Sequence, residues 1–154
     1  MRSRPGGDIR PRDWRLEVLV IRDDLVEAMV AHARADPPDE ACGVIAGPEG
    51  SDRPERFIKM QNAERSPTFY RFDSMEQLRV HRAMEEADEV PVVIYHSHTG
   101  TEAYPSRTDV SIAAEPDAHY VLLSTRDPVE HELRSYRIVD GVVTEEPVKI
   151  VEQY

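Results

Sequence analysis

Apolar and polar residues in the N-terminal part of the chain predict a strand followed by a helix. Residues 16–21, LEVLVI, form a short apolar run typical of a strand. In residues 22–36 the apolar positions recur at the spacing of one helix face. These positions are Leu25, Val26, Met29 and Val30. We expect Asp23 or Asp24 to cap this helix and Pro37-Pro38 to end it.

The next blocks predict a β-hairpin. Residues 42–47, CGVIAG, are typical of a buried strand, in which Gly43 allows another backbone to approach closely. Residues 53–62 alternate well enough to be the partner strand across the turn 48–52. Residues 63–72 follow as an extended segment.

A second helix is predicted to begin at Ser74, because Gln77 three residues later completes a capping-box pattern. Its amphipathic run ends near Ala87. Residues 90–98, VPVVIYHSH, are the most continuous apolar run, as expected of a central strand covered on both faces. A third helix is predicted to start at Ser106.

The C-terminal part reads as strands. Residues 118–125 and 132–139 are strand candidates, and Asp140-Gly141 offers a tight turn into the apolar segment 142–151. Helices thus alternate with a largely β remainder. The pattern predicts the α/β class, with a single domain built on a mixed central β-sheet packed by helices.

Composition limits the classes of protein to consider. At 154 residues the chain is the length of one domain, which we place at 16–154 after an N-terminal tail, 1–15, predicted to be mobile. The basic tail is followed by neither the apolar h-region nor the small-residue cleavage site of a secretory signal, so none is expected. A net charge of −11 argues against nucleic acid and anionic membranes as partners. A membrane span is not expected, because no run of 18 apolar residues occurs. The single cysteine predicts a cytoplasmic protein without an internal disulfide.

The end of the strand 90–98 carries candidate metal ligands. Residues i and i+2 of a strand point to the same face, so His96 and His98 project together while Ser97 points away. A helix beginning at Ser106 places Asp109 in its first turn, where its carboxylate can reach back to the strand. Three protein ligands leave the fourth tetrahedral position of a zinc ion open, as in catalytic zinc sites.

Hydrolysis at such a site also needs a general base. Glu40 is the candidate, because it directly precedes the predicted buried strand and would be held by a rigid element. Ser106 could donate a hydrogen bond to the oxyanion that forms on an attacked carbonyl.

Each of these residues also has a structural interpretation. Ser106 and Asp109 resemble a helix-capping pair, a His-x-His pair on a strand occurs by chance, and Glu40 in a proline-rich loop would ordinarily be a solvated acid. Cys42 could be a ligand or nucleophile, but it fits better as a small buried apolar residue. The remaining histidines lack ligand spacing and are interpreted as structural or exposed. They are His32, His81, His119 and His131.

The whole constellation resembles the motif of the JAMM, or MPN+, metalloproteases. The resemblance rests on Glu40 followed by ACG, on His96-Ser97-His98, and on Ser106 and Asp109 at the family's spacing. The segment NAERSPTFYRF also resembles bacterial members of the family. The resemblance implies an MPN fold and one Zn²⁺ per chain held by His96, His98 and Asp109. It also implies a general acid/base, Glu40, and an oxyanion donor, Ser106.

Several further segments resemble the actinobacterial members more closely, among them GPEGSDRPER, EAYPSRTDV and the ending VEQY. That resemblance implies a substrate: a ubiquitin-like sulfur-carrier protein with a C-terminal Gly-Gly, whose last glycine is joined to cysteine. Hydrolysis would release cysteine in a biosynthetic route. One departure is Thr99, where many members have proline after the second histidine, so the loop 99–105 is expected to take its own path.

Three other functions compete with this interpretation. A non-catalytic MPN scaffold is disfavoured because such members lose metal ligands, whereas this chain keeps them all. The family also includes peptidases and isopeptidases that act on other ubiquitin-like adducts, and this alternative stays open. A zinc nucleoside deaminase is excluded, because its Pro-Cys-x-x-Cys pattern needs two cysteines and only Cys42 is present.

Overall fold

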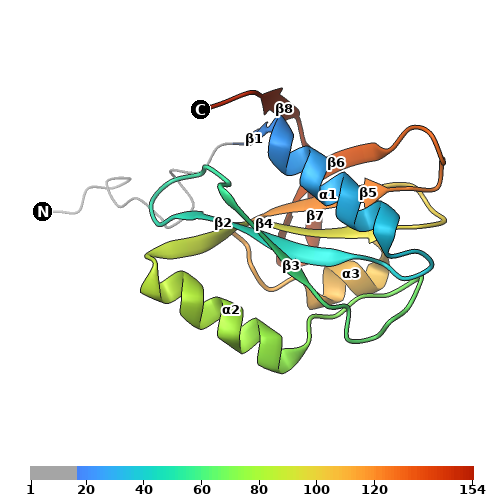
Figure 1. Ribbon diagram of the computed structural model, residues 1–154, viewed down its shortest axis with the longest axis horizontal. Coiled ribbons are helices and arrows are strands. Elements are labelled where there is room, and N and C mark those ends of the chain that lie inside the picture. The colour runs from blue at the N-terminus through green and yellow to red at the C-terminus, as the bar shows by residue number, and fades with distance from the viewer. Residues whose placement is uncertain (1–16) are drawn as a thin grey trace, which may run out of the picture.

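The computed structural model describes residues 17–154, and the predicted tail 1–15 lies outside them (Figure 1). Within the described residues the chain forms eight strands and three helices. The strands are β1 (Leu19–Arg22), β2 (Cys42–Pro48), β3 (Arg56–Met60), β4 (Glu89–His98), β5 (His119–Ser124), β6 (Glu132–Val139), β7 (Val142–Glu146) and β8 (Val148–Val151). The helices are α1 (Asp23–Ala35), α2 (Ser74–Glu86) and α3 (Arg107–Ile112). The predicted elements are therefore confirmed apart from details at their ends and from the segment 142–151, which forms two strands.

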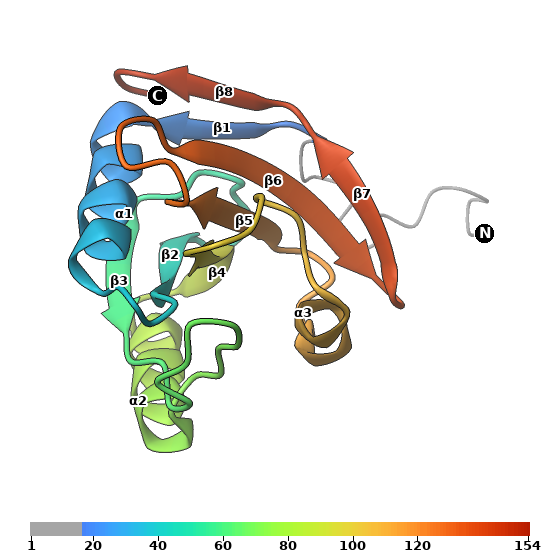
Figure 2. The same ribbon diagram turned by 90° about the vertical axis from the view of Figure 1, so that its right-hand side faces the viewer.

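A mixed sheet of six strands forms the centre of the described part of the chain, in the order β3-β2-β4-β5-β6-β7. Strands β4 and β5 run parallel, and their neighbours pair antiparallel. Strand β1 pairs in parallel with β8 in a small second sheet. Figure 2 shows this pair lying along the six-stranded sheet. The predicted α/β class with a mixed central sheet is confirmed.

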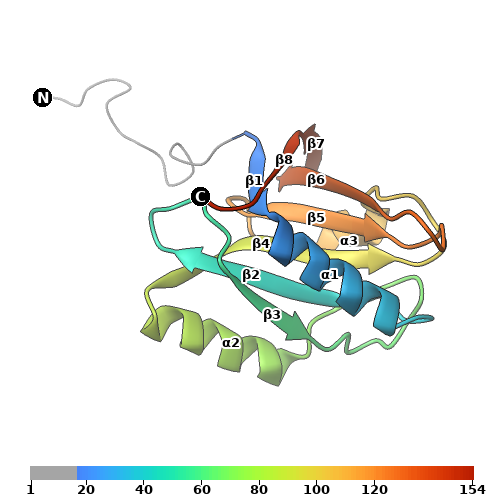
Figure 3. The same cartoon turned by 45° about the horizontal axis from the view of Figure 1, so that its top comes forward.

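The helices cover both faces of the six-stranded sheet. Helix α1 and strand β1 pack on one face, where alternate residues of β4 such as Val93 and Tyr95 are buried (Figure 3). Helices α2 and α3 lie over the other face, which carries Ile94 and Tyr120. Because neighbouring residues of β4 alternate between these two cores, the face of Ile94 is also the face of His96. No described helix is long and apolar enough to cross a bilayer.

Two predicted helix caps are wrong by one or two residues. Helix α1 has Arg22 at its N-cap without a side-chain capping bond, while Asp23 and Asp24 lie in its first turn. There they stabilise the helix through its macrodipole rather than by capping. In α2 the cap is Asp73, whose carboxylate accepts the Glu76 N–H, and not Ser74. An aspartate whose backbone is extended just before the first turn is well placed to accept that N–H with its carboxylate.

The turn at Asp140-Gly141 is confirmed, but the segment after it divides. Both turn residues have positive φ, 51° and 78°, as a two-residue hairpin between β6 and β7 requires. Pro147 then interrupts the segment predicted from 142 to 151, because proline has no N–H for the ladder. The chain leaves the large sheet there, and β8 pairs with β1, with the Leu19 N–H donating to the Pro147 carbonyl at 2.9 Å.

A buried charged cluster joins the start of β5 to the end of β7. His119 is fully buried and makes hydrogen bonds through Nδ1 to Glu146 at 2.5 Å and through Nε2 to Asp52 at 2.9 Å. Arg137 also lies against the Glu146 carboxylate at 3.2 Å. Because both ring nitrogens face carboxylates, the imidazolium, which has two N–H donors, fits this place best. Burial opposes its protonation, but the hydrogen bonds to Asp52 and Glu146 outweigh burial and raise the pKa of His119.

This cluster predicts a stability that falls as the pH rises. The folded state holds the His119 proton more tightly than the unfolded state, whose histidine titrates near pH 6.5. The contribution of the ion pairs is therefore complete below about pH 6.5 and is lost as the pH rises through the raised pKa of the folded state. We expect His119→Gln to lower the free energy of unfolding by about 3 kcal/mol at pH 6 and by less at pH 9. Urea unfolding across this range tests it, and parallel pH curves for both proteins would refute it.

Candidate metal centre

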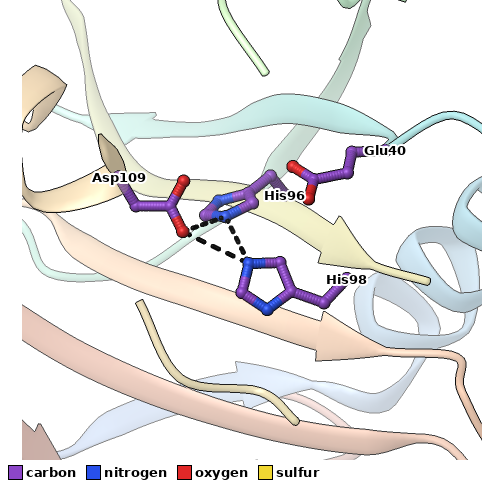
Figure 4. A group of neighbouring side chains, drawn as sticks. All are labelled: Glu40, His96, His98 and Asp109. Carbon is purple, nitrogen blue, oxygen red and sulfur yellow. Dashed lines mark hydrogen bonds and ion pairs between the residues drawn. The ribbon is translucent and has the colours of Figure 1, made fainter. Parts of the chain in front are cut away.

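Four buried side chains converge at one end of the six-stranded sheet (Figure 4). They are Glu40, His96, His98 and Asp109, and each offers one ligand atom within 4.8 Å of all the others. Glu40 lies in the loop before β2, the histidines lie at the end of β4, and Asp109 lies in the first turn of α3. The structure thus brings together four of the five residues singled out from the sequence.

Strand β4 presents both histidines to one side. His96 and His98 point toward Asp109 (Figure 4). Ser97 points to the opposite face, where its hydroxyl meets the main chain of Ala41. The Ser97 hydroxyl accepts the Ala41 N–H at 2.8 Å, and the Ser97 N–H donates to the Ala41 carbonyl at 2.9 Å. The end of β4 is thereby fastened to the residue that follows Glu40.

The three predicted ligand atoms form a nearly equilateral triangle. His96 Nε2 lies 3.2 Å from His98 Nε2 and 3.0 Å from Asp109 Oδ2, and His98 Nε2 lies 3.2 Å from the same oxygen. Ligand atoms about 2.0–2.1 Å from a tetrahedral zinc ion are separated by about 3.3 Å. The donor set and its spacing therefore fit a zinc ion.

The surroundings of His98 favour the tautomer that binds metal through Nε2, and those of His96 favour a neutral ring. The Nδ1–H of His98 donates to the Glu102 carbonyl at 2.8 Å, which leaves the lone pair on Nε2 facing the centre. The ring of His96 stacks on Tyr70 with centroids 4.1 Å apart. Burial lowers the pKa of His96 and so favours the neutral ring that a metal requires. Neither Glu102 nor Tyr70 was found from the sequence, because both contacts depend on the folding of distant loops.

Asp109 has both of the roles considered for it, since it caps α3 and also faces the histidines. Its Oδ2 accepts the Ser106 N–H at 2.8 Å, and its own N–H donates to the Ser106 hydroxyl at 3.1 Å. Burial opposes ionisation, but the close approach of the His96 and His98 rings and the hydrogen bond from the Ser106 N–H hold the pKa of Asp109 well below its usual range. The capping box thus fixes a charged carboxylate against the two rings.

Glu40 is not the solvated acid that its loop suggests. Its side chain is 3% exposed, and its Oε1 is buried with no hydrogen-bond partner in residues 17–154. Burial raises the pKa of Glu40 to about 8, with Asp109 adding to the shift and His98 opposing it. An unpaired buried oxygen beside three converging ligands indicates a place for a further polar group. Gly43 keeps the next strand tightly packed, because a Cβ there would lie 2.7 Å from the Ile58 carbonyl oxygen.

Ser106 is half-buried at the N-cap of α3, next to Asp109 rather than within the four-residue group. Its hydroxyl oxygen accepts the Asp109 N–H, which leaves the O–H proton available to another acceptor. The Ser106 hydroxyl can therefore still donate to an oxyanion, and that role stays a prediction.

The loop after His98 is well fixed without a proline at position 99. Thr99 Oγ1 donates to the Pro67 carbonyl at 3.3 Å, and Ser124 donates to the Thr101 carbonyl at 2.5 Å. Glu132 accepts the Ala103 N–H at 3.0 Å. These contacts hold the Glu102 carbonyl where it can orient His98.

The remaining candidate residues lie outside the group. Cys42 is buried with its thiol toward the Met60 carbonyl, and burial raises its pKa to about 12, so it fits the apolar interpretation. His32 is buried against Tyr95, and His119 belongs to the cluster described above. His81 and His131 are exposed.

Comparison with known proteins agrees with this geometry. The family model of prokaryotic homologues of the JAB domain matches residues 22–139. The CysO-cysteine peptidase of Mycobacterium tuberculosis is 83% identical over 143 residues, which cover 93% of this chain and 98% of the relative. The desampylase of Haloferax volcanii is 32% identical over 111 residues, 69% of this chain and 80% of the relative. A solution structure of a protein from Desulfitobacterium hafniense, 31% identical, superimposes with a TM-score of 0.77 over 88% of this chain and 94% of that one.

Proposed function

Since this chain belongs to the JAB family, also called the JAMM or MPN+ family, we propose that it is a zinc peptidase acting on a ubiquitin-like sulfur carrier. The bond hydrolysed is the amide between the C-terminal glycine of the carrier and an added cysteine. The products are free cysteine, for biosynthesis in the cytoplasm, and the regenerated carrier. The identity of 83% to a CysO-cysteine peptidase supports this choice of substrate.

One observation carries the proposal of catalysis. The unpaired Glu40 carboxyl lies beside the triangle of His96, His98 and Asp109, and all four are buried in one group. A scaffold would have no need to bury this acid without a partner, because an unpaired buried polar group is costly. The completeness of the set therefore supports an enzyme over a non-catalytic MPN scaffold.

His96, His98 and Asp109 are the residues that would hold the ion. Two imidazole nitrogens and one carboxylate oxygen are a donor set that zinc takes in catalytic sites, where a fourth position stays open. When bound there, zinc would lower the pKa of water to about 7 and polarise the substrate carbonyl.

Glu40 and Ser106 then have separate roles, Glu40 in proton transfer and Ser106 in stabilising the oxyanion. Glu40 takes a proton from the attacking water and gives it to the nitrogen of the leaving cysteine as the C–N bond breaks. Its raised pKa of about 8 suits a group that must both accept and return a proton near neutrality. The Ser106 hydroxyl donates a hydrogen bond to the carbonyl oxygen as that atom gains negative charge.

A small cavity on the face of the sheet that carries His96 suits the end of a carrier tail. It has a volume of about 130 Å³, and Tyr70, Phe72, Ile94 and Ile112 are among the residues that line it. Ile94 shares the face of His96, and Tyr70 stacks on that ring. A cavity of this size accepts glycine residues in extended form more readily than bulky ones. We therefore propose that the Gly-Gly end of the carrier is received here.

A comparison of two adducts tests the substrate. We expect the carrier joined to cysteine to be cut at least about 10-fold faster, in kcat/KM, than the same carrier joined to the ε-amino group of a lysine, a difference of about 1.4 kcal/mol. The similarity to a desampylase is the observation that supports the isopeptidase alternative. Faster cleavage of the lysine adduct would replace the proposed substrate by another ubiquitin-like conjugate and leave the peptidase chemistry in place.

A further inference from the structure

Glu40 is held mainly through its backbone. It lies outside any helix or strand, and its Oε1 has no hydrogen-bond partner among residues 17–154. Its N–H donates to the Ser66 carbonyl at 2.8 Å, and the next N–H, of Ala41, donates to the Ser97 hydroxyl at 2.8 Å. The direction of the carboxylate therefore depends on what fixes the main chain at this residue.

The side chain of Asn62 makes further hydrogen bonds to the main chain around Glu40. Its Nδ2 donates to the Glu40 carbonyl at 3.2 Å and to the Phe69 carbonyl at 2.9 Å. Its Oδ1 accepts the N–H of Glu64 at 3.0 Å and the N–H of Arg71 at 3.2 Å. One amide thus joins the main chain of Glu40 to both arms of the loop 62–72.

Asn62 and Ser66 come from the same loop, so the loop holds Glu40 from both sides. The Ser66 carbonyl accepts the N–H of Glu40, while the Asn62 side chain donates to the carbonyl of Glu40. A bridge between Asn62 and Phe72 closes the loop at its base. An aspartate in place of Asn62 would have no donor for the Glu40 and Phe69 carbonyls.

We propose that Asn62 is a positioning residue, which holds the Glu40 carboxylate in reach of the proton it transfers. The catalytic part of this inference rests on the proposed function, whereas the fixing of the Glu40 main chain by Asn62 does not. Displacement of a catalytic group by about 1 Å can cost 100-fold in rate. Outer-shell residues at metal sites commonly contribute about 10- to 100-fold.

Asn62→Asp is the sharpest variant. It keeps an acceptor for the N–H groups of Glu64 and Arg71 but loses every bond that Nδ2 donates, including a long one to the Ser66 carbonyl at 3.5 Å. We expect kcat for the cysteine adduct to fall about 10- to 100-fold, with KM within about 2-fold and with an unchanged metal content. The matched control is Glu64→Gln, which breaks an exposed ion pair with Arg71 in the same loop and spares the Asn62 bonds. The control is expected to stay within about 2-fold of the starting protein.

A double-mutant cycle separates positioning from general loosening of the fold. In a Glu40→Gln background Asn62→Asp should cause less than about a 2-fold further loss, because the group that it positions no longer transfers protons. An equal loss in both backgrounds would overturn the proposal. Should Asn62→Asp fail to fold, Asn62→Gln carries the same cycle with an amide displaced by one methylene.

Amide hydrogen exchange provides a readout that needs no substrate. We expect the N–H groups of Glu40 and Ala41 to exchange at least about 10-fold faster in Asn62→Asp, and at the original rate in Glu64→Gln. Unchanged exchange in Asn62→Asp would overturn the proposal. A wild-type protein that cuts no adduct would instead refute the proposed function. The exchange rates would then still test whether Asn62 fixes the main chain of Glu40.

Discussion

Glu40→Gln is expected to lower turnover of the carrier-cysteine adduct by about 1,000-fold, within the range that general acid-base catalysis contributes. Glutamine has nearly the same shape as glutamate but takes no proton from water and returns none to the leaving amine. Because Glu40 is outside the triangle of the other three side chains, the metal should stay bound. Turnover by mass spectrometry and metal content by elemental analysis of the same sample check both parts.

Asp39→Asn is the matched control for this variant. It removes one negative charge at the neighbouring position, but Asp39 is not part of the converging group. The control should keep turnover within about 2-fold, as expected of a charge change away from the reacting atoms. Wild-type turnover in Glu40→Gln would show that another group transfers the proton.

Asp109→Asn should abolish both metal binding and turnover, the latter by roughly 1,000-fold or more, since a catalytic ion contributes several kcal/mol. The substitution replaces an anionic ligand by a neutral amide. Its remaining side-chain oxygen can still accept the Ser106 N–H, so the capping box of α3 and the fold should survive. Metal content, turnover and the midpoint of thermal unfolding distinguish loss of the site from loss of the fold.

Retention of a tightly bound ion by Asp109→Asn would contradict the assignment of Asp109 as a ligand. The same would follow if turnover persisted without the ion. Asp39→Asn serves again as the control for charge, and its metal content should equal that of the unchanged protein.

Features that depend on local periodicity could be predicted from the sequence. The alternation along β4 placed His96 and His98 on one face, and the Ser106–Asp109 spacing located the first turn of α3. Both depend on neighbouring residues only, and the structure confirms both. The two-residue turn at Asp140-Gly141 is predictable for the same reason.

Features that depend on tertiary contacts could not be predicted this way. Glu40 is 56 residues from His96, and only the antiparallel pairing of β2 with β4 brings them together. Its place before a predicted buried strand made Glu40 a candidate and the motif resemblance supported it, but periodicity alone gave no contact between Glu40 and the histidines. The fastening of Glu40 by Asn62 and the stacking of Tyr70 on His96 likewise arise where the loop 62–72 folds back on the site. The roles of the site residues stay predictions until variants are measured.

The most direct test of the account is the mass of a glycine-terminated sulfur carrier bearing a C-terminal cysteine, followed during incubation with this protein. The account predicts the loss of one cysteine residue, blocked when a chelator removes the metal and restored when zinc is added back. Persistence of the adduct with zinc shown to be bound would contradict the proposed substrate. Loss of cysteine that continues in excess chelator, from protein shown to be free of metal, would contradict the zinc mechanism itself.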